Sequence, residues 1–140
     1  MNYLLDTCAV SEMVKPKPCK AVVEWLQQCD EESVFLSVIT LGEIQKGIAK
    51  LGDKRRRAKI QQWLDTDLRR RFEDRILAVS EDVALTWGAL EGESAAKGRP
   101  IPSIDGLIGA TAIAHNLTVV TRNTKDISAT GARVLDLWNL

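Results

Sequence analysis

Four acidic residues of the chain lie where short apolar segments end or where apolar helical segments begin. Asp6 ends the apolar stretch at the start of the chain, and Asp126 shortly follows the strand-like segment TVVTR at 118–122. Glu43 flanks the apolar stripe of one helical segment, and Asp105 falls in the first turn of another. In an open parallel sheet, ligands bind at the carboxyl ends of the strands. We therefore expect all four carboxylates to converge on one end of a sheet.

A cluster of carboxylates is suited to binding a divalent cation. Two carboxylates about 5 Å apart repel by roughly 3 kcal/mol at an effective dielectric near 20, so four together need a cation. Histidine or cysteine ligand sets are absent, because the chain has one histidine and no Cys-x-x-Cys pair. An all-oxygen site suits Mg²⁺ or Mn²⁺. Such a centre can hydrolyse phosphodiesters with activated water, without a side-chain nucleophile.

Two basic residues lie at or just after the end of the strand-like segment that precedes Asp126. Arg122 and Lys125 can hold the phosphates that flank a scissile bond, or they can simply keep an exposed loop soluble. Each acid also has a purely structural alternative. These alternatives are a favourable helix dipole for Asp105, helix or turn caps for Asp6 and Asp126, and an exposed surface position for Glu43.

The elements that must position these side chains follow an alternating pattern of strands and helices. Five short apolar segments are predicted as strands: Tyr3 to Leu5, Val34 to Leu36, Ile76 to Val79, Thr118 to Thr121 and Arg133 to Leu137. Five longer segments are predicted as helices: Cys19 to Cys29, Ser37 to Leu51 with Ser37 as its cap, Asp53 to Phe72, Glu81 to Lys97 and Ser103 to His115. This alternation indicates a parallel sheet covered on both faces.

The segment from Ser103 to His115 is apolar nearly all round, which predicts a heavily buried helix. Gly106, Gly109 and Ala110 are expected to let this helix approach the sheet closely. Asn116 is predicted as its left-handed C-cap. His115 then lies in the last turn, where a cation beside the helix dipole is the expected role rather than catalysis.

Composition limits the class of protein. The 140 residues suit one domain over residues 1–140, and the odd cysteine count of three argues against a disulfide framework and for a cytoplasmic protein. No segment resembles a signal peptide or a membrane span. The 19 Lys and Arg balance the 19 Asp and Glu, so nucleic-acid binding needs local charge. The basic residues at 54–59 and 69–71 form either such a patch or a solvated helix face.

Four stretches of the chain together resemble the PIN-domain ribonuclease toxins of toxin–antitoxin pairs, the VapC group, and especially its FitB-like branch. These stretches are LLDTCAVSE, LSVITLGEIQKGI, GRPIPSIDGLIGATAIAHNLTVVTRNTKDI and VLDLW. They occur in the expected order over essentially the full length. The resemblance implies a three-layer α/β/α fold with a central parallel sheet of four to five strands. It also implies divalent-metal-dependent endoribonuclease activity, an RNA substrate, a homodimer and a cognate antitoxin.

The resemblance also implies roles for individual residues. Asp6 and Asp105 would be the principal metal ligands and Glu43 the third acid, while Thr121 would hydrogen-bond within the site and orient Asp6. Relatives place the fourth acid either where Asn123 stands or where Asp126 stands, so that position stays open. Cys8 departs from the family, which often has Asn after Asp-Thr.

Other classes fit less well. A haloacid-dehalogenase-type phosphatase needs a second Asp two residues after Asp6, where the chain has Cys8. A phosphoreceiver domain needs adjacent acids at the end of the first strand, which LLDT does not provide. The alternative from a different class is a PIN-like module that binds RNA or protein without catalysis.

Overall fold

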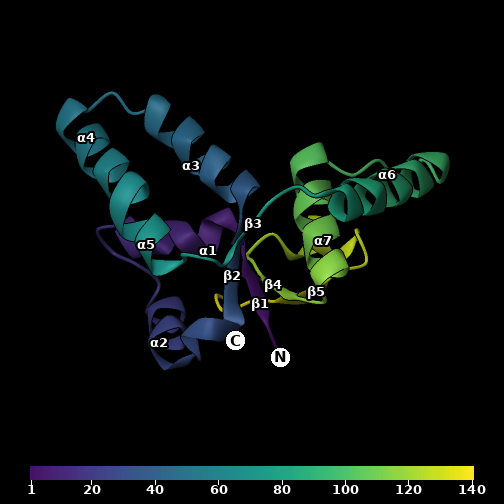
Figure 1. The fold of residues 1–140 in the computed structure, drawn as a ribbon, viewed down its shortest axis with the longest axis horizontal. Helices are drawn as coiled ribbons and strands as arrows, with labels where there is room; N and C mark the ends of the chain where they lie inside the picture. Colours follow the sequence, from purple (N-terminus) through teal and green to yellow (C-terminus); the bar gives the residue numbers. More distant parts are fainter.

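The computed structural model describes residues 1–140 and has an α/β architecture built on one sheet (Figure 1). All five strands are parallel, in the order β3-β2-β1-β4-β5. The strands are β1 (Tyr3–Leu5), β2 (Val34–Ser37), β3 (Ile76–Leu77), β4 (Thr118–Val120) and β5 (Arg133–Leu135). The predicted fold class, a parallel sheet flanked by helices, is confirmed.

Helices connect every pair of successive strands. The α-helices are α1 (Thr7–Ser11), α2 (Lys20–Gln28), α3 (Val38–Ala49), α4 (Lys54–Gln62), α5 (Arg69–Arg71), α6 (Glu81–Ala96), α7 (Ser103–His115) and α8 (Thr124–Ser128). Two 3₁₀ turns, η1 (Glu12–Val14) and η2 (Glu31–Ser33), and one π-helical segment, η3 (Trp63–Leu68), complete the chain. None of these helices combines the length and apolar character that crossing a bilayer requires.

The sheet buries a separate apolar layer on each face. Successive residues of a strand point to opposite faces, so Leu5 and Val120 belong to one layer while Leu4 and Val119 belong to the other. The first layer includes residues of α1, α2, α3 and η3, and the second includes residues of α7 and α8. Figure 1 shows α3 and α4 on one side of the strands and α6 and α7 on the other. Burial on both faces explains why the strands are almost continuously apolar.

The predicted single helix from Asp53 to Phe72 contains a π-helical segment in its middle. Leu64, Leu68 and Phe72 are all buried, at intervals of four residues. That interval exceeds the α-helical period of 3.6, so a regular α-helix would rotate these side chains progressively away from the core. The wider π turn of η3 compensates for this drift and keeps them on one face.

Two glycines of α7 do not have the role predicted from the sequence. A Cβ at Gly106 would meet Glu91 and Trp87 of α6, and a Cβ at Gly109 would meet Thr130. These glycines therefore accommodate α6 and the segment after α8 rather than the sheet. Asn116 does end α7 in the left-handed conformation, with φ 55° and ψ 50°.

Candidate functional site

The carboxyl ends of β1 and β4 form the topological switch point of the sheet. From β1 the chain runs outward to β2 and β3, and it then returns to the other side of β1 to form β4 and β5. Leu5 pairs with Val120 at the end of these two strands, so Asp6 and Thr121 come next to each other. Because the connections leave a switch point in opposite directions, a crevice opens there, and ligands of α/β sheets bind in it.

Asp6 is held rigidly at this crevice by neighbouring hydrogen-bond donors. Its side chain is 8% exposed, and it caps α1 by accepting from the Thr7 backbone N–H at 2.8 Å. Its second oxygen, Oδ2, accepts from Thr121 Oγ1 at 2.8 Å. The Asn123 backbone N–H donates to the same Thr121 hydroxyl at 2.9 Å. Asp6 therefore both caps a helix and presents a fixed carboxylate to the crevice.

Glu43 reaches the same crevice from α3. Ser37 ends β2 and caps α3, accepting from the Ile39 backbone N–H at 3.0 Å. This cap directs α3 across the end of the sheet and past α1. Thr7 Oγ1 donates a hydrogen bond to Glu43 Oε1, which ties the two helices together. The residue immediately after Asp6 therefore orients the second acid.

Asp105 lies in the first turn of α7, and its pKa is raised above the ordinary value. Burial is the main cause, followed by the negative charges of Asp126 and Asp6, with a smaller contribution from Glu43. Asn123 Nδ2 donates to Asp105 Oδ1 at 3.3 Å and partly offsets these effects. The negative charges of the other three acids therefore all act on Asp105.

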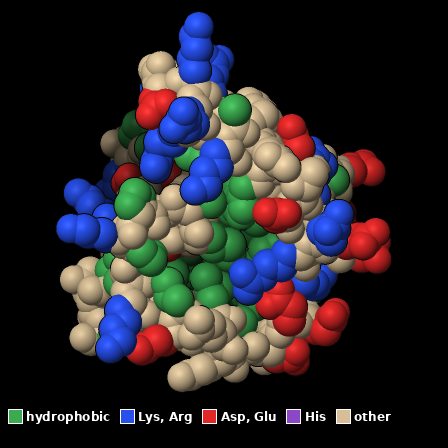
Figure 2. Space-filling model, turned by 90° about the vertical axis from the view of Figure 1, so that its left-hand side faces the viewer, with side chains coloured by type: hydrophobic (Ala, Val, Ile, Leu, Met, Phe, Trp, Pro, Cys, Tyr) green, Lys and Arg blue, Asp and Glu red, His purple; other side chains and the backbone are tan.

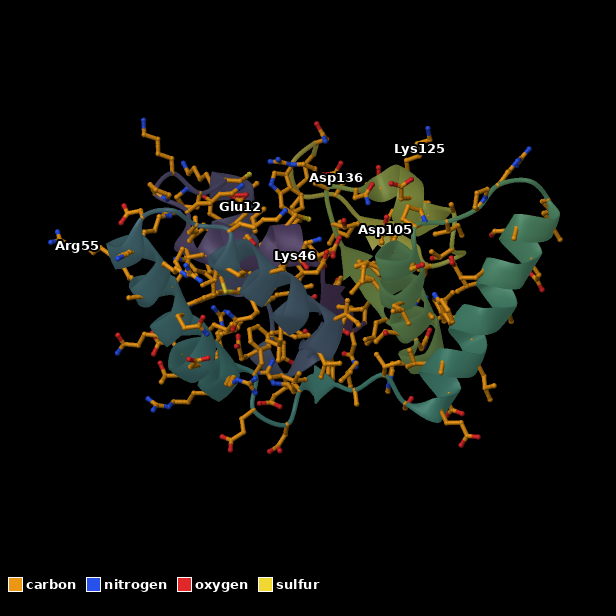
Figure 3. The ribbon with its side chains drawn as sticks, turned by 90° about the horizontal axis from the view of Figure 1, so that it is seen from above. Glu12, Lys46, Arg55, Asp105, Lys125 and Asp136 are labelled. Atoms are coloured by element: carbon orange, nitrogen blue, oxygen red, sulfur yellow. The ribbon has the colours of Figure 1, made fainter.

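Three of the four predicted acids line a common cleft of about 440 Å³. Its lining residues are Asp6, Thr7, Cys8, Glu43, Asp105, Arg122 and Asn123. Asp126 is half-buried, does not line the cleft, and acts on Asp105 through its charge. Figure 3 looks down on this end of the molecule, with Asp105 on α7 near the middle and Lys125 extending outward. Lys125 is exposed and does not line the cleft.

The donor set of the cleft fits a hard divalent cation. None of the carboxylates that line the cleft forms a salt bridge, because the acidic partners in the ion pairs of the structure are Glu12, Glu24 and Glu31. Burial raises the pKa of the Cys8 thiol, with a further contribution from the charge of Asp6, so Cys8 stays neutral. As the side chains stand, no three acidic, His or Cys groups lie at the spacing of ligands around one ion. Mg²⁺ keeps several of its own waters, so more widely spaced carboxylates still suit it.

The basic residues divide into two groups by position. Arg122 lies at the mouth of the cleft, whereas the cluster at 54–59 begins α4 and that at 69–71 forms α5. Figure 2 shows the face on the side of α4 and α5, where Lys and Arg side chains, together with Asp and Glu side chains, surround a hydrophobic hollow. Arg56 also lines a hollow of about 370 Å³ that shares Thr7 and Glu43 with the acidic cleft. Arg56 of α4 therefore borders a hollow that reaches Glu43.

Two residues that the sequence interpretation did not assign to the site belong to its lining. Thr7 holds Glu43, and Cys8 accepts a hydrogen bond from the Arg122 backbone N–H at 3.3 Å. The signal for both was their position immediately after Asp6. A residue that follows a functional acid at a strand end starts the next helix on the same edge of the sheet.

The matches to known proteins agree with this geometry. Residues 3–132 match the model of the PIN domain. Toxin FitB of Neisseria gonorrhoeae is 35% identical over 136 residues, covering 97% of this chain and 98% of FitB. VapC ribonuclease Y4jK of Sinorhizobium fredii is 32% identical over 135 residues, covering 96% of each chain.

Solved structures extend this similarity to the whole fold. The crystal structure of FitAcB from Neisseria gonorrhoeae superposes with a TM-score of 0.92 at 36% identity, over 99% of both chains. VapBC2 from Rickettsia felis, bound to a DNA fragment, gives a TM-score of 0.78 at 26% identity, over 96% of this chain and 98% of that chain. The family model matches residues 3–132, and a FitB toxin and a VapC ribonuclease match over nearly the whole chain, so the chain belongs to the PIN-domain family and, within it, to the VapC- and FitB-like toxins of toxin–antitoxin systems.

Proposed function

We propose that Asp6, Glu43 and Asp105 hold a divalent cation with which the protein hydrolyses RNA phosphodiester bonds as an endoribonuclease. The observation that carries this proposal is the cleft at the switch point, where these three carboxylates lie together without a salt bridge. Membership of the VapC group makes the protein a ribonuclease toxin. The role of each side chain follows from the geometry of the cleft.

A bound Mg²⁺ or Mn²⁺ supplies a nucleophilic water at neutral pH and neutralises charge that develops on phosphoryl oxygens. Thr121 keeps Asp6 Oδ2 oriented, and Thr7 does the same for Glu43. Asn123 donates a hydrogen bond to Asp105 and helps to fix its position. Asp126 adds negative charge that acts on Asp105, which strengthens the attraction of the cleft for a cation.

The protein's partners follow from the same surface. An acidic cleft is electrostatically complementary to a basic side chain, so a cognate antitoxin that inserts an Arg or Lys there would displace the metal and block the substrate. Relatives of known structure include FitAB bound to an IR36 DNA fragment. A homodimer remains part of the proposal and is tested by the mass of the purified protein in solution.

Cleavage of RNA by the purified protein tests the proposed function. Wild-type protein should cut RNA with Mg²⁺ or Mn²⁺ and stop when EDTA is added in excess. Asp105→Asn should lose at least about tenfold in kcat/KM, equivalent to about 1.4 kcal/mol of transition-state stabilisation, while its circular dichroism spectrum stays unchanged. Lys46→Gln on α3, which removes a charge outside the cleft, serves as the matched control. RNA binding without any cleavage would instead establish the non-catalytic PIN-like module.

A further inference from the structure

The aromatic residue Trp138, which follows β5, lies beside the acidic cleft. Its indole ring stacks against Arg122, with the guanidinium carbon 5.2 Å from the ring centroid. Arg122 is the only arginine or lysine that lines the cleft. Trp138 therefore contacts the one basic residue that lines this cleft.

Several independent contacts fix the position of Trp138. Its indole N–H donates to Glu12 Oε2 at 3.3 Å, and its backbone N–H donates to Asp136 Oδ1 at 3.0 Å. The preceding residue, Leu137, is buried in the core layer of α1 and α2, and Trp138 packs against the same layer. A ring held this way is a rigid platform rather than a mobile side chain.

Glu12 is itself well anchored, which explains why it can hold the ring. Its side chain is 2% exposed and accepts hydrogen bonds from the Cys19 backbone N–H at 2.9 Å and Lys15 Nζ at 3.0 Å. Burial acts to raise the pKa of Glu12, but these hydrogen bonds, with that from Trp138, hold it below its usual range. Glu12 is therefore a carboxylate acceptor for the indole N–H at neutral pH.

The stacked geometry leaves the donors of Arg122 free. Stacking uses the face of a guanidinium, whereas its five N–H donors lie in its plane. The Arg122 side chain has no hydrogen bond and no salt bridge in the structure, although its backbone N–H is bonded to Cys8. A planar, immobilised and unpaired set of donors at the mouth of a cleft is suited to bidentate recognition of a phosphate.

We infer that Arg122 binds a phosphate flanking the scissile bond of the RNA and that Trp138 is the positioning residue that holds it there. This inference rests on the proposed function and deepens it. Because a flanking phosphate does not change charge during the reaction, Arg122 contributes equally to ground-state and transition-state binding. Its loss therefore raises KM and leaves kcat nearly unchanged, unlike the loss of Asp105.

Four variants separate positioning from folding. Arg122→Ala removes the donors, Trp138→Leu removes the aromatic face, and Trp138→Phe keeps a face but loses the bond to Glu12. Leu and Phe both fill apolar space, so only the stacking surface distinguishes them. Arg122→Lys keeps the charge but not the planar donors.

The expected results follow the stacking surface. Arg122→Ala should raise KM about tenfold and Trp138→Leu about two- to fivefold, in line with an exposed cation–π contact, with kcat within twofold of wild type. Trp138→Phe should stay within twofold of wild type in KM, and Arg122→Lys should resemble Arg122→Ala more than wild type. Combining Arg122→Ala with Trp138→Leu should add no further increase, since Trp138 acts through Arg122.

A chemical probe identifies the phosphate directly. A short RNA substrate is made with a single uncharged methylphosphonate, placed in turn at each linkage beside the cleavage site. At one linkage the methylphosphonate should weaken RNA binding by the wild type by the same factor as the Arg122→Ala substitution weakens binding of the unmodified RNA. The Arg122→Ala protein should bind the modified and unmodified RNA equally well. Equal KM values for Trp138→Leu and Trp138→Phe, or equal sensitivity of wild type and Arg122→Ala at every linkage, would overturn the inference.

The binding measurement keeps this test separate from the proposed function. The same substitutions are repeated in the Asp105→Asn background, and the Kd for the RNA is measured by fluorescence anisotropy with no cleavage required. A matching series of Kd values supports the Arg122–Trp138 pair even in a protein that does not cut. Cleavage by wild type combined with unchanged Kd and KM across the series refutes the pair while the nuclease assignment stands.

Discussion

Thr121→Val and Thr40→Val form a matched pair that tests how the structure holds Asp6. Both threonines are fully buried, at 0% exposure, and each substitution replaces one hydroxyl by a methyl group of similar shape. They differ in hydrogen bonding. Thr121 Oγ1 donates to Asp6 and accepts from the Asn123 backbone N–H, whereas Thr40 Oγ1 has no partner.

The expected magnitudes follow from these partners. A hydrogen bond to a charged group contributes roughly 1.5–3 kcal/mol and one between neutral groups about 1 kcal/mol, so Thr121→Val should destabilise the protein by about 2–4 kcal/mol. For a chain of this size, that corresponds to a drop of about 6–15 °C in Tm. Thr40→Val removes an unsatisfied polar atom, and it should be neutral or stabilise by up to about 1 kcal/mol.

Thermal melts in EDTA measure this difference without a contribution from metal binding. RNA cleavage measured in parallel should fall at least about tenfold in Thr121→Val, because Asp6 loses its orientation, and should be unaffected in Thr40→Val. Equal Tm changes in the two variants would refute the reasoning that the Thr121 hydroxyl is bound to Asp6. Loss of stability without loss of cleavage would show that Asp6 does not depend on Thr121 for its position.

Three further results are expected. For a metal site with a Kd on the order of 1 mM, 10 mM Mg²⁺ should raise the Tm of the wild type by roughly 3–6 °C and the Tm of Asp105→Asn by less. Equal Tm shifts in the two proteins would contradict metal binding at Asp105. The raised pKa of Asp105 means that its contribution to stability is fully present below its ordinary value of 3.8 and is lost as pH rises through the raised value. In EDTA, the unfolding free energy of wild type minus that of Asp105→Asn should therefore fall as pH rises. The lowered pKa values of Glu12 and Glu31 affect both proteins equally and cancel in this difference. A difference that does not change with pH would argue against a raised pKa of Asp105. Gly109→Ala should lower the unfolding free energy measured by chemical denaturation by about 2 kcal/mol or more, because its Cβ would overlap the Thr130 side chain. Gly92→Ala, with open space around it in α6, should raise the unfolding free energy by about 0.5–1 kcal/mol. Similar effects of the two substitutions would show that α7 does not pack against Thr130 as described.

The sequence alone predicted those features that depend on local pattern. Brief β-branched and apolar runs marked all five strands, because a strand buried on both faces cannot carry polar residues along its length. Short polar residues marked helix starts, as Ser37 does for α3, since its hydroxyl satisfies a backbone N–H that the helix cannot. Asp6 and Asp105 were recognisable because an acid directly after a buried strand or beside the start of an apolar helix is unexpected on burial grounds.

The ends of the strands were less predictable than their existence. Ile76 to Val79 and Arg133 to Leu137 were expected as strands, but pairing stops at Leu77 and at Leu135. Hydrogen bonding to the neighbouring strand determines where a strand ends, and the sequence of one segment does not contain that information. The same limit applies to η3, where the need to keep Leu68 and Phe72 in the core widened the helix.

Only the tertiary structure decided which side chains meet. The partners Thr7 and Glu43 are separated by 36 positions, Thr121 and Asp6 by 115, and Trp138 and Glu12 by 126. The order of the strands, with β2 and β4 on either side of β1, creates such contacts, and no local periodicity encodes them. The roles of the glycines in α7 were missed for the same reason, since the sequence shows that a glycine permits close approach but not which element approaches. Local pattern determines what each segment can be, whereas long-range packing determines what each side chain touches, and the acidic cleft with its arginine depends on the second.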